Sequence, residues 1–295
     1  MARLSGTFSK NGILSKILLL IGFSCLFTVL GVIVLMLFGI GSSVDVRSLK
    51  LMQLVQSVAM FVLPPILIAY LGSDRPAVFL HLDRKVNLFH IGLVVVFMIL
   101  IVPAINLLTS MNQQLVLPKI FAGIETQLKA TELQLAKFTE QMLSVRTIGA
   151  LAFNIFLIAI IPAFGEELFF RAAIQGIFRQ KMSARIAIWS TAIIFSAIHM
   201  QFYGFFPRMF IGAFFGYLLF WSESLWFPIV AHFSNNVLAV LFYYLKYNGY
   251  KVPDIDTIGT GSTLWLGILS IVLAFFGLFW LKSKFQIKNE VAAQV

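Results

Sequence analysis

Two adjacent glutamates lie inside an apolar stretch where charged side chains are costly. Glu166 and Glu167 stand near the middle of the apolar run from Ile148 to Phe178. A charged group at the centre of a bilayer costs about 2.5–3.5 kcal/mol, even on the scale most favourable to insertion. We therefore expect both carboxylates to face protein or water and to have partners. Ionisable groups in such positions are functional by default.

The residues around the glutamates suggest a partner and a local break in the helix. Arg171 follows Glu167 by four residues, one helical turn, so the two can form an ion pair. Pro162 cannot donate a hydrogen bond to the carbonyl of Ile158, and we expect it to kink the helix and to admit polar groups there. An ion pair that only fixes helix packing would explain Glu167 and Arg171, but it leaves Glu166 without a partner.

Two histidines and an amide occur in other apolar runs at helical spacing. His199 follows Phe195 by four residues, and His232 precedes Asn236 by four residues. The second pair therefore shares one face of a helix. Asn235 is adjacent to Asn236, so spacing alone does not decide which asparagine is the amide donor.

These side-chain types suit a hydrolytic centre. A glutamate whose pKa is raised by burial can take a proton from water near neutral pH, and an imidazole can hold that water or relay its proton. A second imidazole and an amide can stabilise the oxyanion of a tetrahedral intermediate. The same atoms could instead bind zinc with one open position. The H-E-x-x-H sequence typical of helical zinc sites does not occur.

The elements that must position these residues are apolar helices. Of the 295 residues, 60% are hydrophobic and 12% are charged, with a mean hydropathy of +0.94. This composition excludes an ordinary cytosolic enzyme and a disordered chain, and the single cysteine excludes a disulfide scaffold. The net charge of +10 is interpreted as basic loops held against an anionic membrane face, so no nucleic-acid partner is expected. We predict an all-α, polytopic membrane protein.

Eight apolar runs approach or exceed the roughly 20 residues needed to cross a bilayer. They are Ile17 to Ile40, Leu51 to Leu71, Leu88 to Leu108, Ile148 to Phe178, Ile186 to Met200, Phe205 to Trp221, Leu225 to Leu245 and Leu264 to Leu281. We therefore predict about eight transmembrane helices, of which the fifth and sixth are short. With both termini in the cytoplasm, twelve lysines and arginines lie inside and five lie in the short outer loops, which favours this orientation.

One sizeable extramembrane helix is predicted over about residues 115–146. Its apolar residues recur in steps of three and four: Phe121, Ile124, Leu128, Thr131, Leu135, Phe138 and Met142. Lys129, Glu132, Lys137 and Glu140 fall between them. The segment is interpreted as an amphipathic helix lying at the membrane interface, with a lid or substrate-guiding helix as the alternative.

Three short motifs resemble those of a known family. The segment 166–171, EELFFR, resembles the EExxxR motif of the CPBP intramembrane proteases, which include the CAAX prenyl endopeptidases and the bacterial Abi proteins. Phe195 to His199 resembles the family's FxxxH motif, and His232 to Asn236 resembles its HxxxN motif. Each motif lies on its own expected span, in the family's order. The match covers about Ile148 to Tyr243, a third of the chain.

The resemblance implies a role for each motif residue. Glu166 would be the general base, His199 would help to activate the water, His232 and Asn236 would form the oxyanion hole, and Glu167 and Arg171 would support the site. The resemblance implies either a metal-free glutamate mechanism or a bound metal such as zinc. If one is bound, the implied ligands are Glu166, His199 and His232.

The resemblance also implies an all-helical core with a polar intramembrane cavity that opens toward the cytoplasm. Counting along the expected spans places His199 near the outer end of its helix and Glu166 near mid-membrane, so their depths disagree. We expect tilted or broken helices to reconcile them. The implied organisation is three spans and the amphipathic helix in 1–147, the protease-like catalytic core in 148–245, and the last span with a basic cytoplasmic tail in 246–295.

The predicted function is that of a hydrolase, an intramembrane endopeptidase that cleaves a membrane-associated or lipid-modified protein or peptide. The expected partners are that substrate and the lipid bilayer, and the oligomeric state is left open. The compact chain resembles the bacterial branch, so we expect the bacterial inner membrane with both termini cytoplasmic. The alternatives are a non-catalytic scaffold or bacteriocin-immunity protein that binds a partner in the same cavity, and a proton-coupled transporter.

Overall fold

The fold is entirely helical in the part of the chain that the structure describes. The computed structural model describes residues 5–40 and 45–293, with side chains described as far as Phe285. Every regular element in these ranges is an α-, 3₁₀- or π-helix, and none is a strand. The prediction of an all-α, polytopic membrane protein is confirmed.

Six helical segments of these ranges are long and apolar enough to cross a membrane. They are α1 (Ile13–Leu37); α2 (Val46–Ser57), η1 (Val58–Val62) and α3 (Leu63–Gly72) as one rod; α8 (Ile148–Asn154), η3 (Ile155–Ile160), α9 (Ile161–Glu166), η4 (Glu167–Gln175) and α10 (Gly176–Phe178) as another; η5 (Phe202–Gly204) with α12 (Phe205–Ser222); α13 (Trp226–Tyr247); and η7 (Gly261–Thr263) with α14 (Leu264–Ala293). Short elements α4 (Pro76–Phe79), η2 (Lys119–Phe121) and η6 (Ile255–Thr257) lie in connections.

A seventh candidate span is broken in the middle. Helices α5 (Leu88–Leu100) and α6 (Val102–Gln113) meet at an angle of 41°. Pro103 stands at the break and cannot donate a backbone hydrogen bond, which accounts for the bend. The Ser270 hydroxyl of α14 donates to the carbonyl of Leu100 at 2.6 Å and accepts from the backbone N–H of Ala104 at 3.2 Å. The last helix therefore holds the broken one in its bent form.

The predicted count of eight spans is not confirmed, because the fifth apolar run forms only a short helix. Helix α11 covers Ala184–Ala197, and its 14 residues reach about 21 Å, less than the roughly 30 Å of a hydrocarbon core. It ends where Met200 takes a left-handed backbone conformation, with φ of 54°. The Ser196 hydroxyl then donates to the carbonyl of Phe205 at 2.6 Å, which ties the end of α11 to the start of α12.

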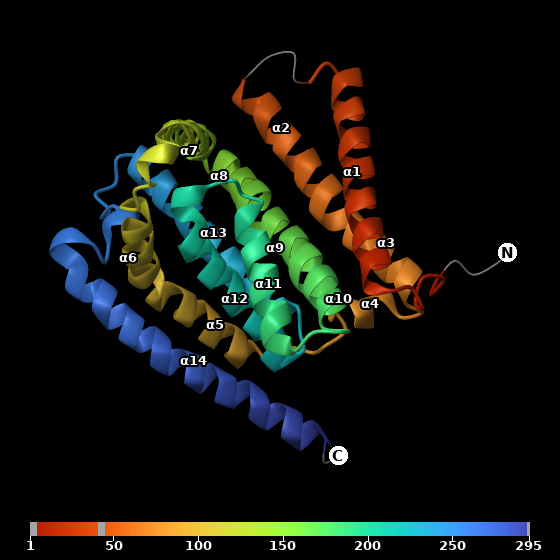
Figure 1. Ribbon diagram of the computed structural model, residues 1–295. Coiled ribbons are helices and arrows are strands. Elements are labelled where there is room, and N and C mark those ends of the chain that lie inside the picture. The colour runs from red at the N-terminus through yellow and green to blue at the C-terminus, as the bar shows by residue number, and fades with distance from the viewer. Residues whose placement is uncertain (1–4, 41–44, 294–295) are drawn as a thin grey trace.

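The helices form a central set with one further group on each side (Figure 1). Helices α8–α10, α11, α12 and α13 lie in the middle, the pair α1 and α2–α3 lies on one side, and α5, α6 and α14 lie on the other. Helix α7 (Ala122–Leu143) lies across the upper end of the molecule in this view. The start of α1 and the end of α14 both lie toward the opposite, lower end.

Candidate active site

The three motifs meet at one internal cavity of about 410 Å³. Its lining includes Glu166 of α9, His199 from the turn after α11, and His232, Asn235 and Asn236 of α13. The first carboxylate, both histidines and both amides singled out from the sequence therefore face a common space. Glu167 and Arg171 do not line it, because both side chains are completely buried beneath it.

Glu167 connects the buried arginine to a histidine of the cavity. Its Oε1 accepts a hydrogen bond from Nδ1 of His232 at 2.8 Å, and its Oε2 lies 3.1 Å from Nε of Arg171. The predicted Glu167–Arg171 ion pair is confirmed. Arg171 also donates through Nη2 to the carbonyl of Gly212 at 3.1 Å, and its guanidinium lies 4.4 Å from the ring centre of Phe195. Because its charge is compensated, Glu167 can fix the orientation of His232.

Glu166 is the carboxylate that can be reached from the cavity. Its side chain is 14% exposed, whereas that of Glu167 is 0% exposed. Its Oε2 lies 4.0 Å from Nε2 of His232, so this imidazole stands between the two glutamates. One adjacent pair of carboxylates therefore supplies a group open to the cavity and a group sealed behind it.

The structure brings His199 to the depth of Glu166 by ending its helix early. Since α11 stops at Ala197, His199 lies inside the molecule and lines the cavity with Glu166. Its Nδ1 is 2.7 Å from the carbonyl oxygen of Phe195, which can only accept. Nδ1 is thus the protonated nitrogen, and Nε2 of the neutral ring is left as an acceptor. The shortness of α11 accounts for the disagreement in depth seen in the sequence.

The side chain of Asn236 donates to the carbonyl of Ile158, to which Pro162 cannot donate because it has no backbone N–H. Its Nδ2 donates to the carbonyl of Ile158 at 3.1 Å, so the predicted entry of a polar group at this point is confirmed. Asn235 donates in turn through Nδ2 to Oδ1 of Asn236 at 3.3 Å. Both amides line the cavity, so both remain candidate donors to a reaction intermediate.

Helix α12 passes close to the site because it carries two glycines. Gln175 and Arg171 donate to the carbonyls of Gly216 and Gly212, each at 3.1 Å. A Cβ at Gly216 would lie 2.6 Å from Oε1 of Gln175, and one at Gly212 would lie 3.3 Å from Nη2 of Arg171. The donors lie on η4, a π-helix, and wide turns of this kind are frequent at functional sites. The sequence pattern gives no indication of these π-helical turns.

Arg208 is a cavity residue that the sequence analysis used only for counting charge. It lies in the first turn of α12 and lines the cavity together with Glu166. Its guanidinium donates to Oε1 of Gln201, while its buried Nη1 has no hydrogen-bond partner in the part of the chain described. The sequence around Arg208 does not indicate that it lines a cavity, because its inward direction depends on the tertiary fold.

The segment after α11 is held in place from two sides. Asn112 of α6 accepts from the backbone N–H of Phe206 at 2.9 Å and donates to the carbonyl of Phe202 at 3.2 Å. Glu132 of α7 accepts from the backbone N–H of Tyr203 at 2.7 Å. Glu132 was expected only on the polar face of the amphipathic helix. Its carboxylate instead points inward and joins α7 to the segment that follows His199.

A second cavity of about 710 Å³ continues from the first. The two share Ile105, Thr109, Arg208 and Asn235, and the second extends to Asp256 in the connection before α14. Partial burial, and next to it the nearby charge of Asp254, raise the pKa of Asp256 above its ordinary value.

The two adjoining cavities lie toward the end of the molecule opposite the start of α1 and the end of α14. The N-terminal region is joined to the other end by Lys16, whose Nζ donates to Oε1 of Gln180 at 3.2 Å. The ring of Phe285 lies there as well, 4.8 Å from Phe227 at the start of α13. If the cavity opens at this end, an opening toward the cytoplasm and two cytoplasmic termini are conflicting expectations.

The implied metal ligands do not converge on one point. Among the residues that the structure describes, no three histidine, cysteine, aspartate or glutamate side chains are grouped closely enough to hold a metal ion. Glu166 and His232 approach to 4.0 Å, but His199 does not complete a set with them. We therefore derive no step through a metal.

Comparison with known proteins gives one match. Residues 148–238, about a third of the chain, match the Rce1-like family, described as type II CAAX prenyl endopeptidase Rce1-like. The matched segment begins at the start of α8 and ends two residues after Asn236, so it contains all three motifs. No curated protein and no solved structure matches the chain.

Proposed function

We propose that the chain cleaves a membrane-associated or lipid-modified protein or peptide. Residues 148–238 match the Rce1-like family, described as type II CAAX prenyl endopeptidase Rce1-like, which is consistent with the CPBP intramembrane proteases. The observation that carries this proposal is the division between the two glutamates. Glu166 faces a polar cavity beside two imidazoles, while Glu167 is sealed on Arg171 and His232. In this arrangement Glu166 is a base that water can reach, and Glu167 fixes the orientation of His232 beside it.

In the proposed reaction, Glu166 takes a proton from a water molecule that also donates a hydrogen bond to Nε2 of His199. The resulting hydroxide attacks the carbonyl carbon of the scissile peptide bond, and the carbonyl oxygen becomes an oxyanion. The amide of Asn235 or Asn236 donates to that oxyanion. Glu166 then returns its proton to the leaving nitrogen as the C–N bond breaks, which gives a carboxylic acid and an amine, and the acid afterwards loses its proton to solvent or to the amine.

His232 can donate a hydrogen bond to the oxyanion only through Nε2. Its Nδ1 already donates to Glu167, so Nε2 can donate to an oxyanion only when both nitrogens carry protons. Phe215 stacks on the ring, with centres 5.3 Å apart, and keeps Nε2 directed toward Glu166.

We further propose that Arg208 binds the C-terminal carboxylate of the substrate. The guanidinium lines both the inner and the outer cavity, and its Nη1 is available for a carboxylate. A chain end held there would present a peptide bond a few residues upstream to Glu166. The enzyme would then cut near the C-terminus of its substrates, since a chain without a nearby free carboxylate would lose this contact.

The test of the proposed function is C-terminal peptide profiling of membranes from cells that express the wild type or Glu166→Gln at matched levels. We expect a set of C-termini to be present with the wild type and absent with the variant. Glu140→Gln, on the exposed face of α7, is the matched control and should retain the whole set. Identical termini in all three samples, with the cellular phenotype of the wild type intact in Glu166→Gln, would instead establish a non-catalytic scaffold or immunity protein.

We also propose that the protein resides in the bacterial inner membrane with both termini in the cytoplasm, as the distribution of basic residues favours. In that orientation the cavity faces the side away from the cytoplasm. The cytoplasmic opening implied by the family resemblance would then not apply to this chain.

A further inference from the structure

An aromatic crevice lies on the membrane side of α12, outside the candidate active site. It is a cavity of about 300 Å³ bounded by α11, α12 and α14. Its aromatic side chains are Trp189 of α11, Phe210, Phe214, Tyr217 and Trp221 of α12, and Phe275 and Phe279 of α14. Phe210, Phe275 and Phe279 remain between 45% and 60% exposed, so the crevice is open to the apolar surroundings of the helices.

The crevice has the length of one lipid chain in one leaflet. Along α12 it runs from Phe210 to Trp221, eleven residues or about 16 Å at the rise of an α-helix. Half of a hydrocarbon core is about 15 Å thick. An acyl chain that starts at the level of Trp221 would therefore reach the middle of the bilayer at the level of Phe210.

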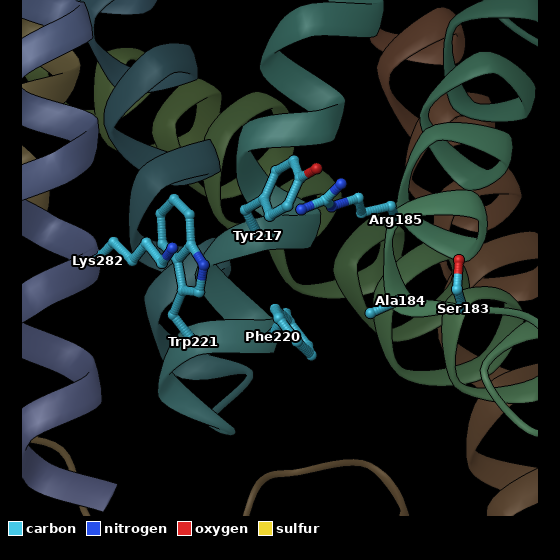
Figure 2. Close-up of a pocket in the computed structure, with 7 residues that line it drawn as sticks. All are labelled: Ser183, Ala184, Arg185, Tyr217, Phe220, Trp221 and Lys282. Atoms are coloured by element: carbon cyan, nitrogen blue, oxygen red, sulfur yellow. The ribbon is translucent and has the colours of Figure 1, made fainter.

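Two cations stand where a lipid headgroup would lie. A separate headgroup cavity of about 690 Å³ adjoins the crevice and shares Tyr217, Trp221 and Lys282 with it. Figure 2 shows Arg185 extending from α11 toward Tyr217, while Lys282 extends from α14 beside Trp221. Both cationic side chains are exposed, and neither forms an ion pair with an acidic group of the described residues.

The position of these cations along their helices matches the membrane interface. Lys282 directly follows the apolar run of α14, and Arg185 lies in the first turn of α11. Basic residues at this level attract anionic lipid headgroups, and tyrosine and tryptophan prefer the same depth.

We propose that this crevice binds one anionic phospholipid. The phosphate lies between Arg185 and Lys282, the Tyr217 hydroxyl lies within reach of the headgroup, and one acyl chain fills the aromatic groove between α12 and α14. The site is independent of the proposed protease chemistry, because Arg171, Phe195 and the cavity lie on the opposite face of α12, beyond Gly212.

The test is native mass spectrometry of the purified full-length protein, delipidated in detergent and titrated with phosphatidylglycerol or with phosphatidylcholine of identical acyl chains. We expect one tight phosphatidylglycerol molecule per chain and no comparable phosphatidylcholine molecule. Arg185→Gln with Lys282→Gln should weaken phosphatidylglycerol binding by roughly thirtyfold, since each basic residue near a membrane surface adds about fivefold.

Two matched variants separate headgroup recognition from general effects. Lys284→Gln removes a cation of the same helix whose Nζ lies against the Trp280 ring, outside the crevice, and should leave binding unchanged. Arg185→Lys keeps the charge and should retain most of the affinity. Equal binding of the two lipids by the wild type, or undiminished phosphatidylglycerol binding by the double variant, would overturn the proposal.

Discussion

At the scale of single residues, neighbouring side chains of the same type have different environments because a helix turns between them. Glu166 and Glu167 point in directions about 100° apart, so one meets the cavity and the other meets Arg171. The sealed carboxylate has two partners, and its loss leaves both of them buried. Substitutions of the two glutamates should therefore have different consequences for stability.

We expect Glu167→Gln to destabilise the protein strongly and Glu166→Gln to leave stability nearly unchanged. Removing one member of a buried ion pair costs about 3–5 kcal/mol, because the guanidinium of Arg171 remains buried without its counter-ion. Thermal unfolding in detergent, followed by tryptophan fluorescence, measures both effects. Equal melting temperatures for Glu167→Gln and the wild type would show that this pair does not stabilise the fold.

The proposed role of Arg208 makes a prediction about substrate chemistry. A peptide substrate with a free C-terminal carboxylate should be cleaved with a kcat/KM about 10- to 100-fold above that of the same peptide with an amidated C-terminus, as for a charged hydrogen bond. Arg208→Gln should remove this difference by slowing only the free acid.

The controls for Arg208 separate the charge from its position. Arg208→Lys keeps the charge but loses the planar fork, so part of the preference should remain. Lys137→Gln, an exposed change on α7, should keep the full preference. If amidated and free peptides are cleaved equally by the wild type, Arg208 does not recognise the chain end.

At the scale of elements, the seam between η4 and α12 depends on the absence of side chains at two positions. The Gly216 and Gly212 carbonyls accept from Gln175 and Arg171 only because α12 lies so close. Small residues play this part wherever membrane helices pack tightly.

Gly216→Ala should lower the free energy of unfolding by about 1–3 kcal/mol, because its Cβ would lie 2.6 Å from Oε1 of Gln175 and 2.9 Å from Cγ2 of Ile188. Gly22→Ala is the control, since a Cβ in that part of α1 meets no other atom within 4 Å. It should be neutral or slightly stabilising. A Gly216→Ala variant as stable as the control would show that the seam can widen without cost.

The sequence predicted this site well where the determinants are local. Motif spacing predicted four of the residues that line the cavity, Glu166, His199, His232 and Asn236, and Pro162 indicated where the amide of Asn236 enters. Helix α11 was predicted to be a span because its sequence is apolar through Met200, but the chain turns earlier. Its end is fixed by contacts with α6, α7 and α12, which lie far away in sequence. The inward positions of Arg208 and Glu132 depend on the same long-range contacts.

At the scale of the whole molecule, the arrangement of the cavity relative to the chain ends makes membrane orientation testable. We expect both termini in the cytoplasm, so a cysteine on α7 should react with a membrane-impermeant maleimide in intact cells, and one near the end of α14 should react only after permeabilisation. Thr131→Cys and Ser283→Cys, each in a Cys25→Ser background, provide exposed sites for this measurement. Labelling of both in detergent is the control. The reverse pattern would place the cavity on the cytoplasmic side, as the family resemblance implies.

The bent pair α5–α6 sets a lower limit on the length of an active fragment of this protein. The family match ends at residue 238 and starts at residue 148, yet Ile105 and Thr109 from α6 form part of the cavity wall. The bend between α5 and α6 is held by the hydrogen bonds of Ser270, which lies beyond the C-terminal boundary of the matched segment. A fragment cut at the boundaries of sequence similarity would retain every motif residue and lose the enclosure around them. Any fragment that keeps this enclosure must therefore include at least the chain from α5 to the middle of α14.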